Sequence, residues 1–426
     1  MNSKGKSIIF FSLHYPFHIS DSYLDKEIDL LSQSFEKVIV ITNNTFSEER
    51  RPTPPNAVVY RFTPFEKRSS FVSLLLLVFK PMFCQEIFRL FFVYKQKISF
   101  GLLKEVLAFY SRSITTKRFL QQVILEQNID TNNLLIYSYW MIESSFASAL
   151  LKQQHSQVKT ITRAHSLDVY FDRSPVKYHP FRQFIFSQMD KIYFISANAR
   201  DYFARAHHFD TDKMQKTAIS RIGIESPTNF IEQRTDETLR IISVGYIQKL
   251  KRIDLIVDTL ALMGDAKIEW VHVGHSNHNE ADFIEVQKYA ANKLGGKSNI
   301  SYRFTGKTSK EDLFNLYAER PFDLHLNVSE TEGIPVSMME AMSYSVPLIG
   351  TNVGGVAEIV EHGVNGFLLS PYPDSAEVKI AIEKFNALPV AQKNVLRKNA
   401  FCTWNAKYNA QVNNQNFVND VMALVG

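Results

Sequence analysis

Two glutamates, Glu332 and Glu340, flank a turn that contains Gly333 and Pro335 and leads into a run of strong helix formers. The pattern predicts a short strand, a tight turn and a helix, with Pro335 in the first helical turn, where a missing backbone N–H costs nothing. The free N–H groups and positive dipole end of such a helix attract anions. Carboxylates beside an anion site accept strong hydrogen bonds from hydroxyls. Together these features indicate a site for a sugar nucleotide.

The spacing of the two carboxylates argues against glycoside hydrolysis. Glu332 and Glu340 are eight positions apart (340 minus 332), which corresponds to at most about 12 Å along a helix. The carboxyl pair of a glycosidase lies about 5 to 9.5 Å apart around one glycosidic bond. We therefore expect the two side chains to contact different parts of one ligand. A surface helix with a capping glutamate is the plainer alternative.

Residues 329–366 resemble the signature of the retaining GT-B glycosyltransferases of family four, in which seven residues separate two glutamates. The resemblance covers the whole chain, weakly before Leu134 and strongly after Leu239. It is closest to members that build bacterial capsule, colanic-acid-like and lipopolysaccharide chains. Four more segments follow the family's order: residues 161–170, 243–257, 270–274 and 304–309.

The resemblance implies roles for the residues around this turn. Glu340 would hydrogen-bond the ribose hydroxyls of the donor, and Glu332 would reach hydroxyls of the donor sugar. Lys251 matches the family's diphosphate-binding lysine, and Gly306 and Lys307 match a loop near the nucleotide base. The other expected donor-binding residues are Gly245, Gly333, Ile334, Pro335, Val336 and Ser337.

One position departs from the family pattern. In the segment 243–257 the family places an arginine just after the glycine, which is Gly245 here. Tyr246 stands at that position instead. Lys249 or Arg252 is a candidate for the missing charge, although loop cations are more often simply solvated. Because no acidic metal-binding cluster is visible, we expect a metal-independent enzyme in which Lys251 neutralises the leaving group.

His165 lies in the segment R-A-H-S-L-D, between Arg163 and Asp168. A lone histidine after a strand is usually structural. The corresponding histidine of the family faces the donor sugar, so the resemblance implies that His165 orients sugar hydroxyls or stabilises charge. Asp168 is a weaker candidate that braces the loop.

Several further residues carry weaker expectations. Gly354 and Gly355 let the backbone approach closely, either to the ligand or within a simple turn. Ser345 stands where the family commonly has glycine, so that turn is expected to differ. His14 and His18 are low-ranked candidates for contact with the acceptor.

Two series of alternating strands and helices position these residues and predict an α/β architecture. With the resemblance, this becomes a GT-B fold of two doubly wound Rossmann-like domains facing each other across a cleft. The expected parts are an acceptor-binding domain (1–226), a nucleotide-sugar-binding domain (238–403) and a C-terminal helix crossing back to the first domain (404–426). The polar segment 226–237 is the expected linker. Strands are predicted at residues 7–13, 37–42, 58–61, 134–137, 159–163, 191–195, 239–244, 268–273, 300–305, 324–327 and 347–350, and a helix at 20–32.

A helical insert, residues 69–120, interrupts the first series with apolar runs punctuated by lysines and arginines. A basic amphipathic helix can lie on an anionic bilayer, and similar inserts in the family are associated with lipid-linked acceptors. Helices that pack their apolar faces against the sheet are the more common outcome, and we favour it here.

Composition sets broader bounds. The 426 residues suffice for two or three domains, and the net charge of +5 suits acidic ligands but is too weak to indicate nucleic acid. The two cysteines, Cys84 and Cys402, lack metal-type spacing and fit a reducing compartment. The longest apolar run, residues 71–79, is far shorter than the roughly 18 residues of a membrane-spanning helix. A cytoplasmic protein is expected, with contact at the inner face of the cytoplasmic membrane as a further hypothesis.

These observations lead to one main functional expectation. The chain would be a retaining hexosyltransferase that moves a hexose from a UDP-sugar or GDP-sugar, without a cofactor, onto a polyprenyl-diphosphate-linked glycan of a bacterial surface polysaccharide. Closure of the two domains would assemble the site. A GT-B nucleotide-sugar epimerase is one alternative. A non-catalytic partner of another transferase, binding nucleotide or membrane, is the other, and Tyr246 prompts it.

Overall fold

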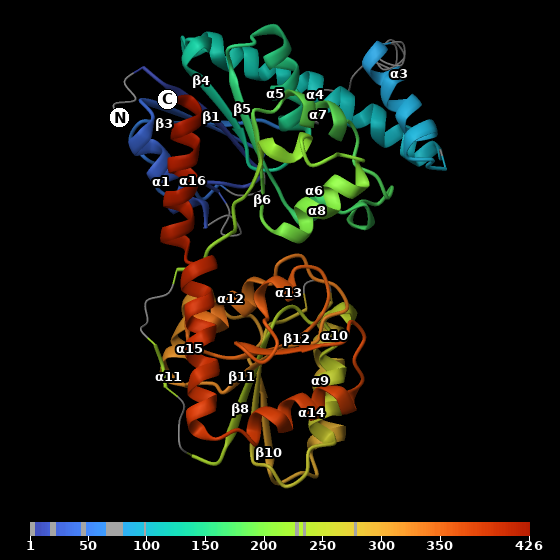
Figure 1. The fold of residues 1–426 in the computed structure, drawn as a ribbon, viewed down its shortest axis with the longest axis vertical. Coiled ribbons are helices and arrows are strands. Elements are labelled where there is room, and N and C mark those ends of the chain that lie inside the picture. The colour runs from blue at the N-terminus through green and yellow to red at the C-terminus, as the bar shows by residue number, and fades with distance from the viewer. Residues whose placement is uncertain are drawn as a thin grey trace. The chain divides into compact units, whose positions relative to one another are not determined.

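The computed structural model describes residues 5–17, 23–43, 48–64, 80–97, 99–225, 230–232, 236–276 and 279–426. The chain forms two compact units, each with its own sheet (Figure 1). Unit 1 contains Met1–Arg221 together with Gln411–Gly426, and unit 2 contains Ile222–Ala410. The chain therefore passes between the units twice.

Unit 1 is built on a parallel sheet of seven strands in the order β3-β2-β1-β4-β5-β6-β7. The central strands are continuous apolar runs buried on both faces, as expected of a parallel sheet covered by helices. The strands are β1 Ser7–Ser12, β2 Lys37–Thr42, β3 Ala57–Arg61, β4 Leu134–Ser138, β5 Lys159–Ala164, β6 Lys191–Phe194 and β7 Thr217–Ile219.

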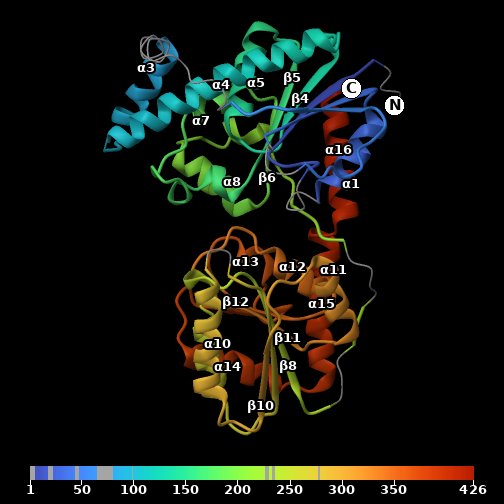
Figure 2. The same ribbon diagram turned by 180° about the vertical axis from the view of Figure 1, so that it is seen from behind.

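Helices cover both faces of this sheet (Figures 1 and 2). The last helix, α16, follows unit 2 in the sequence but buries Phe417, Val418 and Val421 in the core of unit 1. The helices of unit 1 are α1 Leu24–Ser34, α3 Pro81–Phe88, the π-helix η2 Arg89–Val93, α4 Phe100–Glu126, α5 Glu143–Gln154, α6 Ser166–Val169, α7 Arg182–Gln188, α8 Ala197–Ala206 and α16 Ala410–Val425.

Unit 2 repeats the doubly wound plan with six parallel strands in the order β10-β9-β8-β11-β12-β13. Apolar side chains on both faces of the sheet pack under its helices. The strands are β8 Leu239–Val244, β9 Ile268–Val273, β10 Ile300–Phe304, β11 Leu324–Asn327, β12 Leu348–Thr351 and β13 Gly366–Leu369. The helices are α9 Ile253–Ala261, α10 Glu280–Leu294, α11 Lys310–Glu319, α12 Val336–Ser343, α13 Val356–Ile359, α14 Ser375–Asn386 and α15 Val390–Lys407.

The eleven strands expected from the sequence are present within one residue at each end. Two short strands, β7 and β13, were missed. The first predicted helix begins later than expected, at Leu24, and the part of it at residues 20–22 lies outside the described residues. The segment expected to form one crossing helix is instead split at Tyr408 and Asn409 between α15 and α16.

The helical insert packs inward along α4. Leu102, Val106, Phe109 and Leu120 are buried in unit 1, which confirms the expectation that its apolar face meets the protein interior. Residues 69–79 of the insert lie outside the described residues. In the described part of the chain, no helix combines the length and the apolar character needed to cross a bilayer.

Candidate functional site

In unit 2, Lys251 and Glu332 form an ion pair where two neighbouring strands end. Lys251 lies in the short 3-10 turn after β8, Glu332 follows β11, and β8 and β11 pair directly. The Lys251 Nζ lies 2.6 Å from Glu332 Oε1. Asn327 at the end of β11 donates to the same oxygen at 3.1 Å. The structure thus joins two predicted catalytic residues and adds Asn327, which sequence reasoning missed.

Glu340 contrasts with this paired carboxylate. It lies on α12 with only 8% of its surface exposed. Its backbone carbonyl accepts from Ser343 Oγ at 2.7 Å, and no hydrogen bond from the described residues reaches its carboxylate. Burial raises the pKa of the Glu340 carboxyl, and the positive charge of Lys310 opposes that rise. A buried carboxylate without a donor is a site where a ligand's hydroxyls are well received.

The turn before α12 differs from expectation at one residue. Pro335 has extended backbone angles and is the N-cap, so it precedes the first helical turn instead of occupying it. The missing N–H of proline is harmless here because the N-cap N–H makes no bond within the helix. The backbone N–H groups of Val336 and Ser337 belong to the first turn and lack partners within the helix.

The glycine pair of the following loop packs against this turn. Gly355 donates its backbone N–H to the Gly333 carbonyl at 2.7 Å. A Cβ built on Gly354 would lie 1.9 Å from the Glu332 carbonyl oxygen, and one on Gly355 would lie 2.4 Å from the Gly333 oxygen. The close backbone approach expected of Gly354 and Gly355 is therefore made to the protein's own turn, and it fixes the backbone beside Glu332.

Glycines at the ends of β8, β9 and β10 also come together. Gly245 donates to the Val273 carbonyl at 2.9 Å, and a Cβ on Gly274 would lie 2.0 Å from the Gly245 oxygen. Gly274 and Gly306 form an isolated antiparallel bridge. The loops that carry the predicted residues Gly245 and Gly306 are thus stacked at one edge of the sheet, and Lys307 extends from there as an exposed side chain.

The departure at Tyr246 is visible in the structure. Tyr246 is 53% exposed directly after Gly245. Arg252 donates to the Pro373 carbonyl at 2.9 Å, and Lys249 is exposed on the 3-10 turn. Of the two cations expected to compensate, Arg252 is therefore engaged in holding a neighbouring loop.

In unit 1, His165 follows β5 and its ring packs against two aromatic rings. The ring centroids of His165 and Trp140 are 4.1 Å apart, and those of His165 and Tyr139 are 4.7 Å apart. The side chain is buried, and neither ring nitrogen has a hydrogen-bond partner among the described residues. Burial lowers the pKa of His165 well below its usual range, and Arg163 adds to the effect, so the imidazole is neutral at pH 7.

The neighbours of His165 have structural roles. The Asp168 carboxylate accepts the backbone N–H of His165 at 2.6 Å and of Met141 at 2.7 Å, which braces the loop as expected. Burial raises the pKa of Asp168 to about 7, although both hydrogen bonds and the charge of Arg182 oppose the rise. Arg163 forms a buried ion pair with Glu27 at 2.7 Å.

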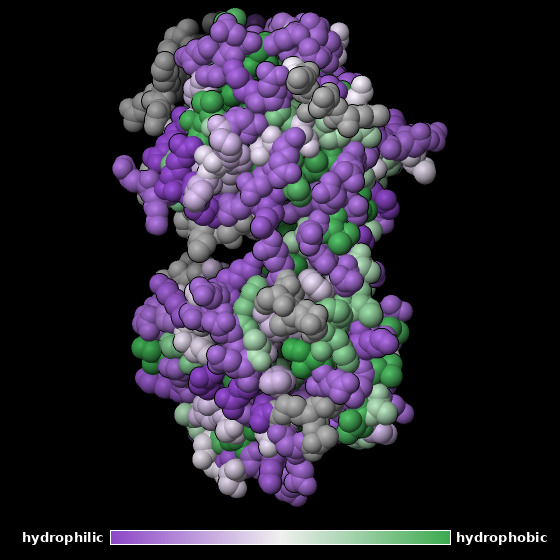
Figure 3. Space-filling model, turned by 90° about the vertical axis from the view of Figure 1, so that its left-hand side faces the viewer, coloured by the Kyte–Doolittle hydropathy of each residue, from purple (hydrophilic) through white to green (hydrophobic). Residues whose placement is uncertain are grey.

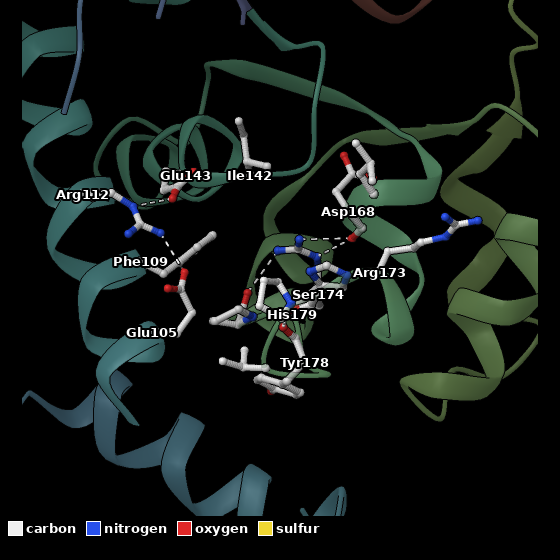
Figure 4. Close-up of a pocket in the computed structure, with 15 residues that line it drawn as sticks. Glu105, Phe109, Arg112, Ile142, Glu143, Asp168, Arg173, Ser174, Tyr178 and His179 are labelled. Carbon is white, nitrogen blue, oxygen red and sulfur yellow. Dashed lines mark hydrogen bonds and ion pairs between the residues drawn. The ribbon is translucent and has the colours of Figure 1, made fainter. Parts of the chain in front are cut away.

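A cavity of about 260 Å³ lies beside α6 in unit 1 (Figure 4). Arg112 reaches Glu105 at 2.8 Å and Glu143 at 2.6 Å across one wall. Arg182, which also lines the cavity, donates to the Asp168 carbonyl at 3.1 Å. Arg112 is thus paired with two carboxylates, whereas Arg182 binds backbone carbonyls, and the cavity is a polar recess next to the His165 loop. Within the described residues, no group of histidine, cysteine or acidic side chains is placed to hold a metal ion.

Comparison with known proteins finds similarity over part of the chain. Residues 226–401 match the model of the family described as Glycosyl transferases group 1. N-acetyl-alpha-D-glucosaminyl L-malate synthase of Bacillus anthracis is 23% identical over 279 residues, which cover 61% of this chain and 65% of that relative. The amylovoran biosynthesis glycosyltransferase AmsK of Erwinia amylovora is 24% identical over 163 residues, which cover 36% and 38%. The chain thus spans less than two thirds of the length of either relative.

The fold is also that of solved structures. The crystal structure of HepE from Anabaena in complex with UDP superposes with a TM-score of 0.63 at 15% sequence identity, covering 98% of this chain and 100% of that one. Two doubly wound parallel sheets and this likeness confirm the expected GT-B fold. The chain therefore has the GT-B fold, and residues 226–401, which lie in its unit 2, match the glycosyl transferases group 1 model.

Proposed function

We propose that the chain is a retaining, metal-independent glycosyltransferase that moves a hexose from a nucleoside diphosphate sugar onto a lipid-linked glycan of a bacterial surface polysaccharide. The observation that carries the proposal is the largely buried Glu340 carboxylate, which accepts no hydrogen bond from the described residues and lies on α12, the helix after the turn that holds the paired Glu332. One carboxylate is left for ligand hydroxyls, and one cation lies at the strand ends to meet phosphate charge.

The comparisons support the finer parts of the proposal to different degrees. The solved structure of HepE holds UDP, which supports a nucleotide donor of this class. The relative named for amylovoran biosynthesis supports a polysaccharide product. Retention, a hexose donor and a polyprenyl-diphosphate acceptor rest on the sequence resemblance, as does a place at the inner face of the cytoplasmic membrane.

Each residue has a proposed part in the reaction. Glu340 binds the ribose hydroxyls, and the N–H groups at the start of α12 bind the diphosphate. Lys251 shares its charge between Glu332 and the diphosphate. It neutralises the nucleoside diphosphate that leaves as the anomeric C–O bond of the donor breaks and the glycosidic bond to the acceptor hydroxyl forms. Glu332 holds hydroxyls of the donor sugar, and neutral His165 contributes hydrogen bonds to them without acting as a nucleophile.

The test begins with a thermal-shift screen of the purified chain against UDP, GDP, ADP and their sugars. One nucleotide series should raise the melting temperature, and the matching donor should release free nucleotide when acceptor is present. Glu340→Ala should weaken nucleotide affinity by about tenfold to a hundredfold, because charge-assisted hydrogen bonds are worth about 1.5 to 3 kcal/mol. Glu361→Ala, on an exposed turn, is the control and should bind normally. Equal affinity in the Glu340 variant would remove the proposal's main support.

Tyr246 favours a second candidate, a non-catalytic nucleotide-binding partner of another transferase. An exposed tyrosine stands where the family has an arginine, and Arg252 is occupied by the Pro373 carbonyl. Nucleotide binding without turnover of any donor would select this candidate. Tyr246→Arg, which supplies the cation that the family has at this position, would then be expected to create measurable donor turnover.

A further inference from the structure

Large apolar side chains gather on the surface where η2 turns into α4. Phe88 is 58% exposed, Phe91 57%, Phe92 59% and Phe100 83%. Four of the five phenylalanines exposed among the described residues thus fall within thirteen positions. We call Phe88, Phe91, Phe92, Val93 and Phe100 the aromatic tip.

The face of unit 1 shown in Figure 3 is different. On the face of unit 1 shown in Figure 3, hydrophilic residues predominate and hydrophobic ones lie among them. Single exposed apolar residues are normal on a folded protein, whereas a contiguous cluster of large ones marks a surface that meets an apolar partner.

The tip is held in place by the fold. Phe83, Leu90, Leu102 and Val106 on the inward sides of α3, η2 and α4 are buried in the core of unit 1. The Ser99 hydroxyl caps α4 by accepting the Leu102 N–H at 3.1 Å, and Gln96 donates its N–H to the Leu90 carbonyl at 3.0 Å. The inward faces of these helices are therefore packed in the core of unit 1, and the exposed phenylalanines do not belong to that core.

Three of the exposed rings, those of Phe88, Phe91 and Phe92, lie against one another. The ring centroids of Phe88 and Phe92 are 4.5 Å apart, and those of Phe91 and Phe92 are 4.9 Å apart. In both ribbon views the turn from η2 into α4 lies at the end of α4 farthest from the sheet (Figures 1 and 2).

The surroundings of the tip are basic. Lys80, Lys95, Lys97 and Lys104 are exposed. The sole acidic residue between positions 80 and 104 is Glu86, which is buried and accepts hydrogen bonds from Tyr178 and Phe181. The tip therefore shows aromatic rings and positive charge together, with no exposed negative charge in the same stretch.

We infer that the aromatic tip docks unit 1 on an anionic phospholipid surface. Aromatic side chains enter the boundary between headgroups and acyl chains, and surrounding lysines are attracted by anionic headgroups. Pairing with a second copy of the chain through the same tip would bring two sets of lysines together, so like-charge repulsion disfavours it. The docking surface is this tip, and the buried face of α4 takes no part in it.

The purpose of the docking rests on the proposed function, since a lipid-linked acceptor is presented at a membrane surface. Binding itself is independent of that function and is measured without donor or acceptor. Failure of vesicle binding would therefore leave the transferase proposal standing, and absence of donor turnover would leave the docking surface standing.

Cosedimentation of the full chain with vesicles tests the inference. Vesicles of phosphatidylcholine with about 30 mol % phosphatidylglycerol should bind the protein, and vesicles of phosphatidylcholine alone should bind it more weakly. Phe91→Gln together with Phe92→Gln should lower the affinity about tenfold or more, because the apolar contact with the bilayer is lost. Lys95→Glu together with Lys97→Glu should remove most of the dependence on phosphatidylglycerol.

Matched controls separate the tip from exposure in general. Tyr372→Gln with Ile380→Gln changes two exposed apolar residues of unit 2, and Lys288→Glu with Lys398→Glu reverses two of its charges. Both controls should bind vesicles like the wild type, and all variants should keep the wild-type melting temperature. Phe92→Trp gives a direct readout, because its fluorescence should shift to the blue when anionic vesicles are added.

Two results would overturn the inference. One is vesicle binding that is absent, or unchanged in the Phe91/Phe92 and Lys95/Lys97 variants. The other is concentration-dependent dimerisation that the Phe91/Phe92 variant abolishes, since it would assign the tip to a second copy of the chain.

Discussion

At the scale of single residues, the two glutamates of the motif are in opposite states. Glu332 accepts from Lys251 and Asn327, whereas the carboxylate of Glu340 is largely buried and accepts no hydrogen bond from the described residues. The oxygens of Glu340 are not among the buried side-chain atoms without a partner, so solvent, and equally a ligand hydroxyl, can reach them. Glu332 is therefore already part of an ion pair, whereas Glu340 can accept hydrogen bonds from a ligand.

Removal of the Lys251 charge should separate stability from activity. Lys251→Met leaves Glu332 with one neutral donor, so the free energy of unfolding should fall by about 1 to 3 kcal/mol, and donor turnover should fall by about a hundredfold or more. Adding Glu332→Gln should restore most of the stability without restoring turnover. Urea denaturation and nucleotide release measure the two effects. Turnover that recovers in the double variant would contradict the leaving-group role of Lys251.

Buried His325 should make unit 2 sensitive to acid. Neither ring nitrogen has a hydrogen-bond partner among the described residues, and burial, aided by Lys251, lowers the pKa of His325 to about 3. The unfolded chain takes up a proton near pH 6.5 and the folded chain does not, so the stability present above pH 6.5 is lost as pH falls toward 3. At about 1.4 kcal/mol per pH unit, His325 contributes a loss of about 2 kcal/mol by pH 5.

His325→Leu should remove this contribution. The variant should match or exceed the wild type at pH 7.5 in urea denaturation, because it replaces a buried polar ring without partners by an apolar side chain. Its stability should also fall less between pH 7.5 and pH 5. An equal fall in both proteins would show that His325 is already protonated or solvated.

At the scale of elements, the end of α12 keeps a backbone conformation usually given to glycine. Ser345 has a φ of 62°, and its hydroxyl accepts the backbone N–H of Ile231 at 3.0 Å. The serine at the family's glycine position therefore does not reshape the turn into one with negative φ. Its side chain ties the segment before β8 to the turn after α12.

Substitutions at Ser345 should rank in an unusual order. Ser345→Gly relieves about 1 kcal/mol of left-handed strain while losing the hydrogen bond, whereas Ser345→Ala keeps the strain and loses the same bond. The glycine variant should therefore be more stable than the alanine variant by about 1 kcal/mol. At Ser343, the last residue of α12, the alanine variant should be more stable than the glycine variant, because alanine has the higher helix propensity. Thermal unfolding of the four variants measures both orders, and the same order at both sites would contradict the strain argument.

At the scale of the whole molecule, the chain returns to its first unit after completing its second. Phe417 of α16 packs on Tyr137 and Tyr193, and the Arg163 guanidinium lies 4.4 Å from its ring centroid. Asp420 of the same helix binds Lys191 at 2.6 Å and the Tyr193 hydroxyl at 2.8 Å. The last sixteen residues thus belong to unit 1, and the inward face of α16 is part of its core.

Loss of this packing should destabilise unit 1. Phe417→Ala should lower the free energy of unfolding by about 3 to 5 kcal/mol, because a buried ring is removed and a cavity remains. Val412→Ala, at an exposed position of the same helix, should change it by less than about 0.5 kcal/mol. Denaturation followed by tryptophan fluorescence gives both values. A small effect at Phe417 would mean that unit 1 is stable without α16.

Much of the architecture was predictable because its signals are local. The apolar run within Lys37–Thr42, for example, identified a buried parallel strand with correct bounds. The strands β7 and β13 were missed because three or four residues are too few to show a periodic pattern. They are strands because they pair with a neighbouring strand of the sheet. The place of Pro335 was wrong by one residue because a proline fits both the N-cap and the first turn.

The sequence by itself determined the two α/β units, the turn with its two glutamates and the lysine that follows β8, because these depend on periodicity and motif spacing. The tertiary structure alone decided that Lys251 pairs with Glu332 and that Asn327 donates to the same carboxylate. It also decided that Arg163 forms an ion pair with Glu27. It also decided which rings of the helical insert enter the core and which stay outside. Such choices depend on neighbours distant in the chain, whose contacts and burial no local pattern encodes.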